Sequence, residues 1–129
     1  MLFRSPSKIL TLFKKIEKIT KEKKDLTIVV ALNYSSKHEI ANAFNKIIKQ
    51  KYAKITEKII SENLYTFNIP DPDILIRTGS HSRLSNFLLW QMSYTEIFFV
   101  KKLWPDFKRK DLSIIISKFK KIKRNFGSV

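Results

Sequence analysis

The feature that most constrains the fold is the alternation of short apolar runs, rich in β-branched residues, with longer amphipathic segments. Three such runs are typical of strands: residues 26–34 (LTIVVALNY), 73–77 (DILIR) and 96–100 (EIFFV). A near-continuous apolar run indicates a parallel strand that is covered on both faces. Strands that alternate with helices predict an α/β fold, which we expect as a partial parallel sheet flanked by helices.

Amphipathic spacing predicts helices over residues 5–24, 36–48, 54–64, 85–91 and 111–122. Ser5 and Pro6 mark the start of the first helix, and Asp111 is placed to cap the last. Ser36 and Glu39 have the S-x-x-E spacing of a capping box. We expect the first helix to pack on a sheet, with a helix on a membrane surface as the alternative.

Three strands make a narrow sheet, and the 129 residues of the chain are one ordinary domain or a piece of a larger one. A parallel strand buried on both faces needs neighbours, because an uncovered edge exposes unpaired backbone groups. We therefore expect the sequence to be the second half of a fold.

The formal net charge of +15 implies attraction to an anionic partner, which could be nucleic acid, acidic lipid or a phosphorylated substrate. Most of the excess is lysine spread along the chain, a pattern typical of a solvated surface, so charge does not decide the partner. The absence of cysteine excludes disulfides and cysteine-bound zinc and fits a cytoplasmic location. The longest apolar runs fall short of the roughly 20 residues that span a bilayer, and we expect no secretion signal.

Ligands of open parallel sheets bind beyond the carboxyl ends of the strands. Three groups are predicted there: residues 33–37, residues 77–85 and the neighbourhood of Glu96. Arg77 and Arg83 offer planar forks of donors that grip phosphate, and Gly79 lets backbone approach a ligand. Ser85 is predicted at a helix N-terminus, where free amides bind anions.

The alternatives to these assignments remain open at this point. The two arginines could be ordinary surface residues, and Glu96 could be a magnesium ligand or an exposed strand residue. His81 suggests an acid or base, but no Ser-His-Asp order or zinc pattern supports that role.

The run DPDILIRTGSHSRLSNFLLWQMSYTEIFFVKKLWPDF resembles the C-terminal signature of the cis-prenyltransferases, the undecaprenyl diphosphate synthase family. ALNYSSKHEI similarly resembles the family block A-x-N-Y-G-G-R-x-E-I, and RNFGS resembles its R-R-F-G-G tail. The resemblance covers nearly the whole chain and implies a transferase that condenses isopentenyl diphosphate onto an allylic diphosphate with Mg²⁺. It places Arg77, Arg83 and Ser85 on isopentenyl diphosphate positions, and Glu96 on the magnesium-associated glutamate.

The sequence departs from the family pattern at several phosphate or magnesium contacts. The departures are Ser35 and Ser36 for two glycines, Lys37 for an arginine, Ser80 and His81 for Gly-Glu, and Asn125 for the second arginine of the tail. The family's D-G-N-G loop with its catalytic aspartate does not occur, and the only glycines are Gly79 and Gly127. The catalytic residues of this chain are therefore unknown.

We interpret residues 1–129 as the C-terminal part of a cis-prenyltransferase domain without its N-terminal half. The expected function is to carry the isopentenyl diphosphate site and to elongate a prenyl chain only when an N-terminal half complements it. The alternative is an inactive subunit or decayed remnant that pairs with a full-length synthase, and a basic nucleic-acid-binding module is less favoured. A homodimer and a peripheral contact with a membrane are further expectations from the resemblance.

Overall fold

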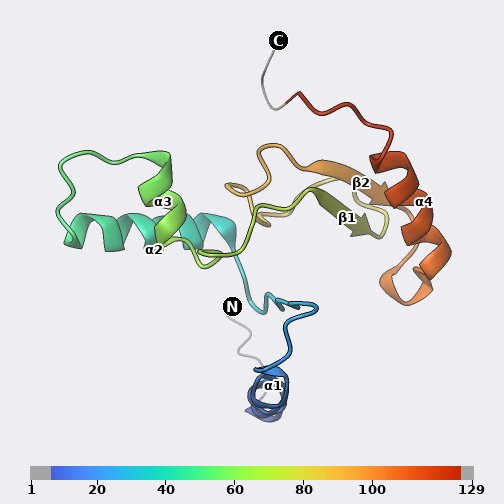
Figure 1. Ribbon diagram of the computed structural model, residues 1–129, viewed down its shortest axis with the longest axis horizontal. Helices are drawn as coiled ribbons and strands as arrows, with labels where there is room; N and C mark the ends of the chain where they lie inside the picture. Colours follow the sequence, from blue (N-terminus) through green and yellow to red (C-terminus); the bar gives the residue numbers. More distant parts are fainter. Residues whose placement is uncertain (1–6, 126–129) are drawn as a thin grey trace. The chain divides into compact units, whose positions relative to one another are not determined.

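The computed structural model describes residues 7–125 and divides into two compact units, the first ending at Ser35 and the second beginning at Ser36 (Figure 1). The first unit contains helix α1 (Ser7–Thr20). The second contains α2 (Ser36–Lys49), α3 (Glu57–Asn63), strand β1 (Ile74–Thr78), strand β2 (Glu96–Val100), the 3₁₀ helix η1 (Trp104–Asp106) and α4 (Arg109–Phe119). The predicted α/β class is confirmed, with a parallel sheet and helices beside it.

The first unit differs from the prediction in its apolar run. α1 ends at Thr20 rather than Lys24, and its predicted start at Ser5 and Pro6 lies outside the described residues. The strand expected over residues 26–34 is wrong: this segment has no strand structure, and Ile28 is 76% exposed. A strand needs a neighbour for its backbone hydrogen bonds, and in residues 7–125 the described strands pair only with each other.

The apolar side chains of that segment line a pocket with α1 instead. Leu26, Ile28, Val30 and Leu32 alternate along the extended chain, so that they share one side of it. Leu10, Phe13 and Ile16 of α1 line the same pocket, which has a volume of about 540 Å³. The near-continuous apolar run predicted as a buried strand is therefore an extended segment of the first unit, and its large apolar side chains line this pocket or face solvent and are 44–76% exposed.

The core of the second unit lies around α2 and α3. Ala43 and Ile47 of α2 are buried with Ile60, Leu64 and Met92. Thr56 caps α3, because its side-chain oxygen accepts a hydrogen bond from the Ile59 N–H at 3.3 Å. The helices predicted over residues 36–48 and 54–64 are thus present, the second starting three residues late.

The helix predicted over residues 85–91 is absent from the structure. Ser85, Asn86 and Leu88 have φ angles of 51°, 64° and 44°, which belong to the left-handed region and cannot continue a right-handed helix. The segment folds as a series of turns that pack on α2, with Gln91 and Met92 buried. Tertiary hydrogen bonds to α2, described below, replace the helical ones.

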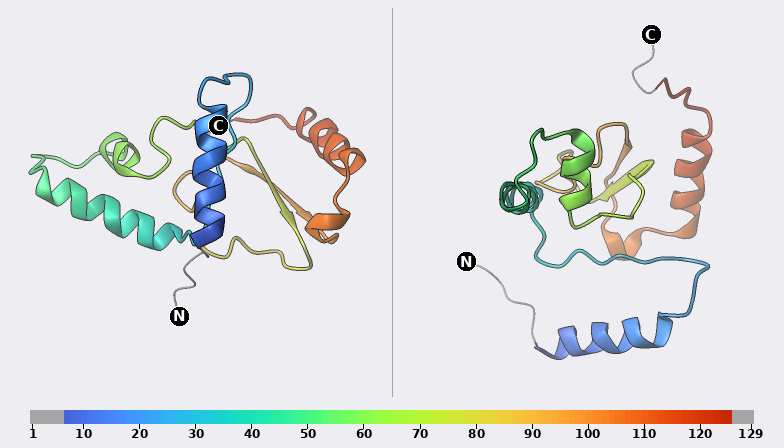
Figure 2. Two further views of the ribbon diagram at one scale, coloured as in Figure 1. Left: turned by 90° about the horizontal axis from the view of Figure 1, so that it is seen from below. Right: turned by 60° about the vertical axis from the view of Figure 1, so that its left-hand side comes forward.

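The two strands pair in parallel from Ile74 opposite Glu96 to Thr78 opposite Val100. α2 and α4 lie on opposite sides of this sheet in each view (Figures 1 and 2). Ile115 is the buried residue of α4, and the helix ends at Phe119 instead of the predicted Ile122. No helix within residues 7–125 is long and apolar enough to cross a membrane.

Candidate diphosphate-binding site

The loop that follows β1 carries most of the predicted site, and its start is fixed by backbone geometry. Gly79 has a φ of 99°, a conformation that a side chain would strain. Its N–H donates a 2.8 Å hydrogen bond to the carbonyl of Lys102, just beyond the carboxyl end of β2. The turn after β1 is therefore attached to the neighbouring strand at the edge where α/β sheets bind ligands.

The far end of the same loop is attached to the N-terminus of α2. The Ser36 N–H donates to the carbonyl of Asn86, and the Lys37 N–H donates to Asn86 Oδ1, both at 2.9 Å. In return, Ser36 Oγ accepts from the Leu89 N–H at 2.9 Å. These bonds satisfy amides of the first turn of α2, which have no partner within the helix.

Residues 79–86 thus form a loop anchored at both ends, which we call the diphosphate loop. Sequence reasoning found its arginines but missed its anchors, Asn86 and Ser36, because they lie 50 residues apart and give no local signal. The residue type at position 86 offered one hint, because asparagine tolerates the left-handed region, in which Asn86 lies, better than most residues.

Arg77 and Arg83 differ in how they are held. Arg77 comes from β1 and is half-buried, and its Nε is buried without a hydrogen-bond partner among the described residues. A buried, unpaired donor is unfavourable by roughly 1–3 kcal/mol and usually signals a missing partner. Arg83 and Ser85 are exposed on the loop. The three predicted residues therefore lie on one strand and the loop that follows it, and two of them, Arg83 and Ser85, are exposed to solvent.

The predicted position of Ser85 at a helix N-terminus is wrong, because Ser85 has a positive φ and no helix follows it. The residue can still offer its hydroxyl, but helix amides do not support an anion at this point. His81 is exposed on the same loop.

Glu96 lies at the opposite end of the strands from the diphosphate loop. It was expected near the carboxyl end of a strand, but it opens β2 and pairs with Ile74, three positions before Arg77. Three residues of parallel strand span roughly 10 Å. The expectation is wrong because β2 runs from Glu96 to Val100, which places the glutamate at the amino end of the strand.

Glu96 lines a polar cavity of about 280 Å³ at the amino end of the sheet. Lys123, Arg124 and Asn125 line it too, together with residues 93–95. Asn125, which replaces a family arginine, thus lies in the same cavity as Glu96. The remaining residues of the RNFGS tail lie outside the described part of the chain.

The donor chemistry fits a magnesium ion only in part. Mg²⁺ is usually held by one or two carboxylates together with substrate phosphates and water, so a single glutamate is an acceptable ligand. Within residues 7–125, no three His, Asp or Glu side chains gather to hold a metal by themselves. Glu96 also lies far along the strand from Arg77, so this chain does not bring the two predicted contacts together.

Arg124 holds the chain after α4 against the amino end of the sheet. Its guanidinium forms an ion pair with Asp73, donates to the carbonyl of Tyr94 at 3.0 Å and lies 5.5 Å from the centre of the Phe119 ring. Asp73 and Arg124 lie 51 residues apart, so their pairing cannot be deduced from local sequence.

A buried polar cluster lies between α2 and the turns that follow the diphosphate loop. Glu39 is fully buried, and its carboxylate accepts hydrogen bonds from the Tyr65 N–H at 2.7 Å and from Gln91 Nε2 at 3.2 Å. Gln91 Nε2 also donates to Thr66 Oγ1 at 2.9 Å. Glu39, predicted for a capping box, therefore connects α2 to both the segment after α3 and the turns after the diphosphate loop.

Comparison with known proteins identifies the family of the chain. Residues 2–127 match the prenyltransferase family model described as undecaprenyl diphosphate synthase. The chain belongs to this family. An isoprenyl transferase from Thermotoga maritima is 41% identical over 128 residues, covering 96% of this chain and 55% of the relative. One from Helicobacter pylori is 48% identical over 119 residues, covering 88% and 51%.

Solved structures of the undecaprenyl diphosphate synthase family share the fold. A probable undecaprenyl diphosphate synthase from Campylobacter jejuni aligns with a TM-score of 0.83 at 34% identity, covering 99% of this chain and 60% of its own. A lavandulyl diphosphate synthase from Lavandula x intermedia, in complex with dimethylallyl diphosphate, aligns with a TM-score of 0.89 at 31% identity, covering 97% and 56%. The chain spans about half the length of the curated relatives it matches.

Proposed function

We propose that this chain supplies the isopentenyl diphosphate site of a cis-prenyltransferase. In this proposal Arg77 and Arg83 bind the diphosphate by two-point hydrogen bonds, and the Ser85 hydroxyl donates a further bond. The observation that carries it is the buried, unpaired Nε of Arg77 beside the anchored loop of a chain that belongs to this family. A diphosphate oxygen would give that donor the acceptor it lacks.

The contribution of these residues would be to bind and orient. Fixing the diphosphate positions the carbon skeleton for attack and removes translational freedom from the reacting pair. A bound magnesium ion would supply positive charge to a departing diphosphate, and Glu96 is the residue of this chain that would hold it. The separation of Glu96 from Arg77 means that such an ion would serve a phosphate other than the one held at the diphosphate loop.

Elongation of a prenyl chain requires a second site, for the allylic diphosphate. In the family pattern the D-G-N-G loop has this role, and no D-G-N-G occurs in these 129 residues. We therefore propose that the chain is active only with a complementary N-terminal half, and that it pairs with that half or with a second copy of itself. We also propose a cytoplasmic protein with a peripheral membrane contact.

The second candidate is an inactive subunit that pairs with a full-length synthase. It is favoured by Ser80 and His81 in the diphosphate loop and by Asn125 in the cavity with Glu96, because each replaces a residue that would contact phosphate or metal in the family pattern. Co-purification with a full-length synthase, together with absent diphosphate binding, would support it over the first proposal. Binding to RNA that falls steeply with salt would instead favour the nucleic-acid module.

The proposal is tested by calorimetric titration of the purified chain with isopentenyl diphosphate and Mg²⁺. We expect the variant with Arg77→Ala and Arg83→Ala to lose affinity at least roughly a hundredfold, since each charge-assisted hydrogen bond contributes about 1.5–3 kcal/mol. The matched control carries Lys49→Ala and Lys54→Ala, two exposed lysines at and after the end of α2 that is opposite Ser36, and it removes the same charge without touching the loop or its anchors.

Two outcomes of the titration would overturn the proposal. A folded chain that does not bind isopentenyl diphosphate lacks the site. Equal losses in the loop variant and the lysine control would show that only the overall charge attracts the ligand. Prenyl chain elongation by the purified chain alone with Mg²⁺ would disprove the requirement for a second half.

A further inference from the structure

Positive charge is concentrated at the end of the described chain. Residues 108–125 contain eight lysines and arginines and one acidic residue, a net charge of +7 out of the chain's +15. Three of the basic residues, Lys108, Arg109 and Lys110, lie at the start of α4. Cations at a helix N-terminus oppose the helix dipole, so helix stability does not explain their placement.

The outer side of α4 carries a basic stripe with an apolar residue in it. Lys110, Ser113, Ile114, Ser117, Lys118 and Lys121 line a shallow groove of about 290 Å³. Their spacing of three and four residues places them along one side of the helix. Ile114 is 46% exposed, whereas the next residue, Ile115, is 5% exposed and forms the inner side.

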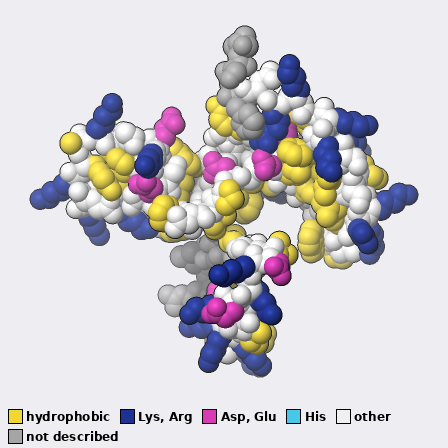
Figure 3. All heavy atoms as spheres, viewed as in Figure 1, with side chains coloured by type: hydrophobic (Ala, Val, Ile, Leu, Met, Phe, Trp, Pro, Cys, Tyr) yellow, Lys and Arg dark blue, Asp and Glu magenta, His cyan; other side chains and the backbone are white. Residues whose placement is uncertain are grey.

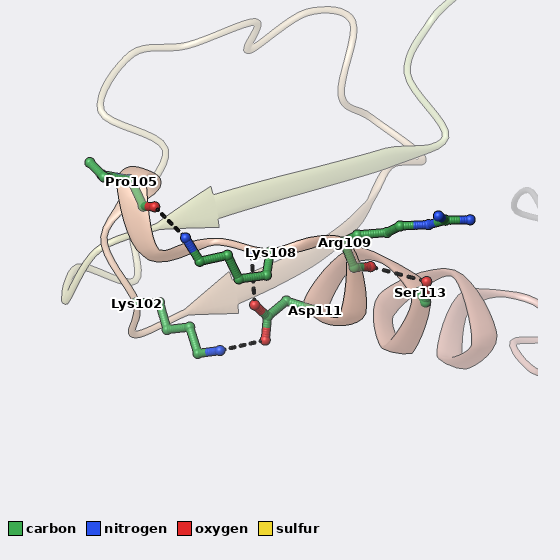
Figure 4. A network of polar contacts seen from close by, with 6 residues as sticks. All are labelled: Lys102, Pro105, Lys108, Arg109, Asp111 and Ser113. Carbon is green, nitrogen blue, oxygen red and sulfur yellow. Dashed lines mark hydrogen bonds and ion pairs between the residues drawn. The ribbon is translucent and has the colours of Figure 1, made fainter.

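The single acidic residue of α4 is turned away from this stripe. Asp111 accepts a hydrogen bond from Lys102 Nζ at 2.7 Å and another from the Lys108 N–H at 2.9 Å. Figure 4 shows Asp111 pointing toward Lys102, while the Arg109 side chain extends away from that network. The Lys102 ammonium holds the pKa of Asp111 below its usual value, so this carboxylate stays paired and does not neutralise the stripe.

Exposed apolar side chains precede the helix. Leu103 is 62% exposed and Trp104 is 73% exposed, and the Trp104 ring stacks on Phe107 with 6.0 Å between the ring centres. Lys108 Nζ donates to the carbonyl of Pro105 at 3.2 Å, which attaches η1 to the start of α4. Figure 3 shows hydrophobic and basic side chains side by side over this part of the molecule.

We propose that η1 and the basic stripe of α4 form a docking surface for a bilayer that contains anionic lipids. The lysines meet the negative headgroups, and Ile114 and Trp104 enter the boundary between headgroups and acyl chains. Charge complementarity selects the partner, because clustered lysines near an anionic leaflet each add favourable energy. Tryptophan at such a boundary places its apolar ring inward and its N–H toward water.

A nucleic acid would meet the same charge but not the same apolar groups. Proteins that bind single strands stack bases on aromatic side chains along a basic groove. The groove on α4 is lined by lysine, serine and isoleucine, with no aromatic residue among its described lining, and Trp104 of the proposed surface lies outside the groove and already stacks on Phe107. The surface therefore fits a membrane better than RNA, and this inference does not depend on whether the diphosphate loop binds its ligand.

The test is co-sedimentation of the whole chain with vesicles of phosphatidylcholine alone and of phosphatidylcholine with one quarter phosphatidylglycerol. We expect binding only to the anionic vesicles, weakened by added salt. The variant Lys110→Glu, Lys118→Glu, Lys121→Glu should bind at least about tenfold more weakly. The matched control Lys14→Glu, Lys15→Glu, Lys18→Glu makes the same charge change on α1 and should retain most of the binding.

Insertion is tested separately by tryptophan fluorescence. In a Trp90→Phe background, the emission of Trp104 should shift to shorter wavelength when anionic vesicles are added, and Trp104→Ala should weaken sedimentation. Equal binding to both vesicle types, loss of binding in the α1 control alone, or an unshifted Trp104 emission would each overturn the proposal. So would tighter binding to an RNA oligonucleotide that the α4 variant abolishes, and circular dichroism checks that every variant is folded.

Discussion

The two sides of the second unit differ in how many of their residues are buried. The side formed by α2, α3 and residues 85–92 contains nearly all of the buried residues, including a fully buried carboxylate with its donors. On the side of β1, β2 and α4, Ile115 is the single buried residue among those described, and both strands are half-buried at most. One side has a finished core, while the other presents apolar surface.

This difference shows where the chain depends on further structure. The helical side contains most of the fully buried side chains and pairs the Glu39 carboxylate within its own residues, although Gln91 Oε1 has no hydrogen-bond partner among the described residues. A two-stranded parallel sheet is too small to bury its side chains by itself, because parallel sheets are normally covered on both faces. The exposed surface of β1 and β2, rather than the outer side of α4, is therefore where we expect a complementary half or a second copy to pack, in keeping with a chain that spans about half the length of its relatives.

The largest effect on stability is expected at Ile47. This α2 residue is 1% exposed, so Ile47→Ala should lower the free energy of unfolding by about 3 kcal/mol through lost burial and a cavity. Ile48 is its neighbour and is 69% exposed, so Ile48→Ala should change stability by less than about 0.5 kcal/mol. Urea titration measures both, and similar losses would show that the helical core is not packed as described.

The second test concerns the buried carboxylate. Glu39→Gln replaces one acceptor oxygen by a donor, which opposes the Tyr65 N–H or Gln91 Nε2, and we expect a loss of about 2 kcal/mol. Glu57→Gln changes an exposed glutamate on α3 and is the control. An unchanged urea midpoint for Glu39→Gln would mean that the cluster does not connect α2 to the turns after the diphosphate loop.

A smaller effect is expected on the sheet side, at Arg124. Arg124→Ala removes the ion pair with Asp73 and the bond to the Tyr94 carbonyl, and should lower stability by about 1 kcal/mol, because the Asp73 side chain is 69% exposed and its charge is screened. Lys123→Ala, one residue away, should have no measurable effect. Equal effects of the two substitutions in thermal unfolding would remove Arg124 as the anchor of this segment.

The smallest expected effect is a pH dependence at Asp111. Its pKa is lowered in the folded protein, chiefly by the hydrogen bond from Lys102 and then by that from the Lys108 N–H. A lowered folded pKa gives stability that is present above the ordinary aspartate value of about 3.9 and lost as the pH falls through the folded value. The stability difference between the wild type and Asp111→Asn should therefore shrink below pH 4, and a constant difference from pH 7 to pH 2 would contradict this.

Local sequence predicted most of the secondary structure, because helical spacing and β-branched runs act over a few residues. The patterns correctly identified α2, α3, β1, β2 and α4 to within a few residues. They failed at residues 85–91, where tertiary bonds from Ser36 and Lys37 override helical spacing. They failed again at residues 26–34, whose near-continuous apolar run has no strand to pair with among the described residues.

The candidate site was predictable in composition but not in geometry. Arg77, Arg83 and Ser85 follow from residue chemistry and the resemblance, and their roles stay predictions. The position of Glu96 depends on strand register, and the partners of Glu39 and Asp73 are 26 to 52 residues away in sequence. Such contacts are properties of the folded chain rather than of any short segment.

The hydrogen bonds between α2 and the turns after the diphosphate loop have a consequence for how the protein folds. They join residues 49 to 53 positions apart, whereas α2 and α3 are neighbours in sequence. Contacts across such a separation require loop closure before they stabilise anything, so they tend to form late. We expect substitutions at Asn86 to speed unfolding while leaving the folding rate nearly unchanged. During synthesis, the diphosphate loop would become ordered only after the turns that follow it have been made.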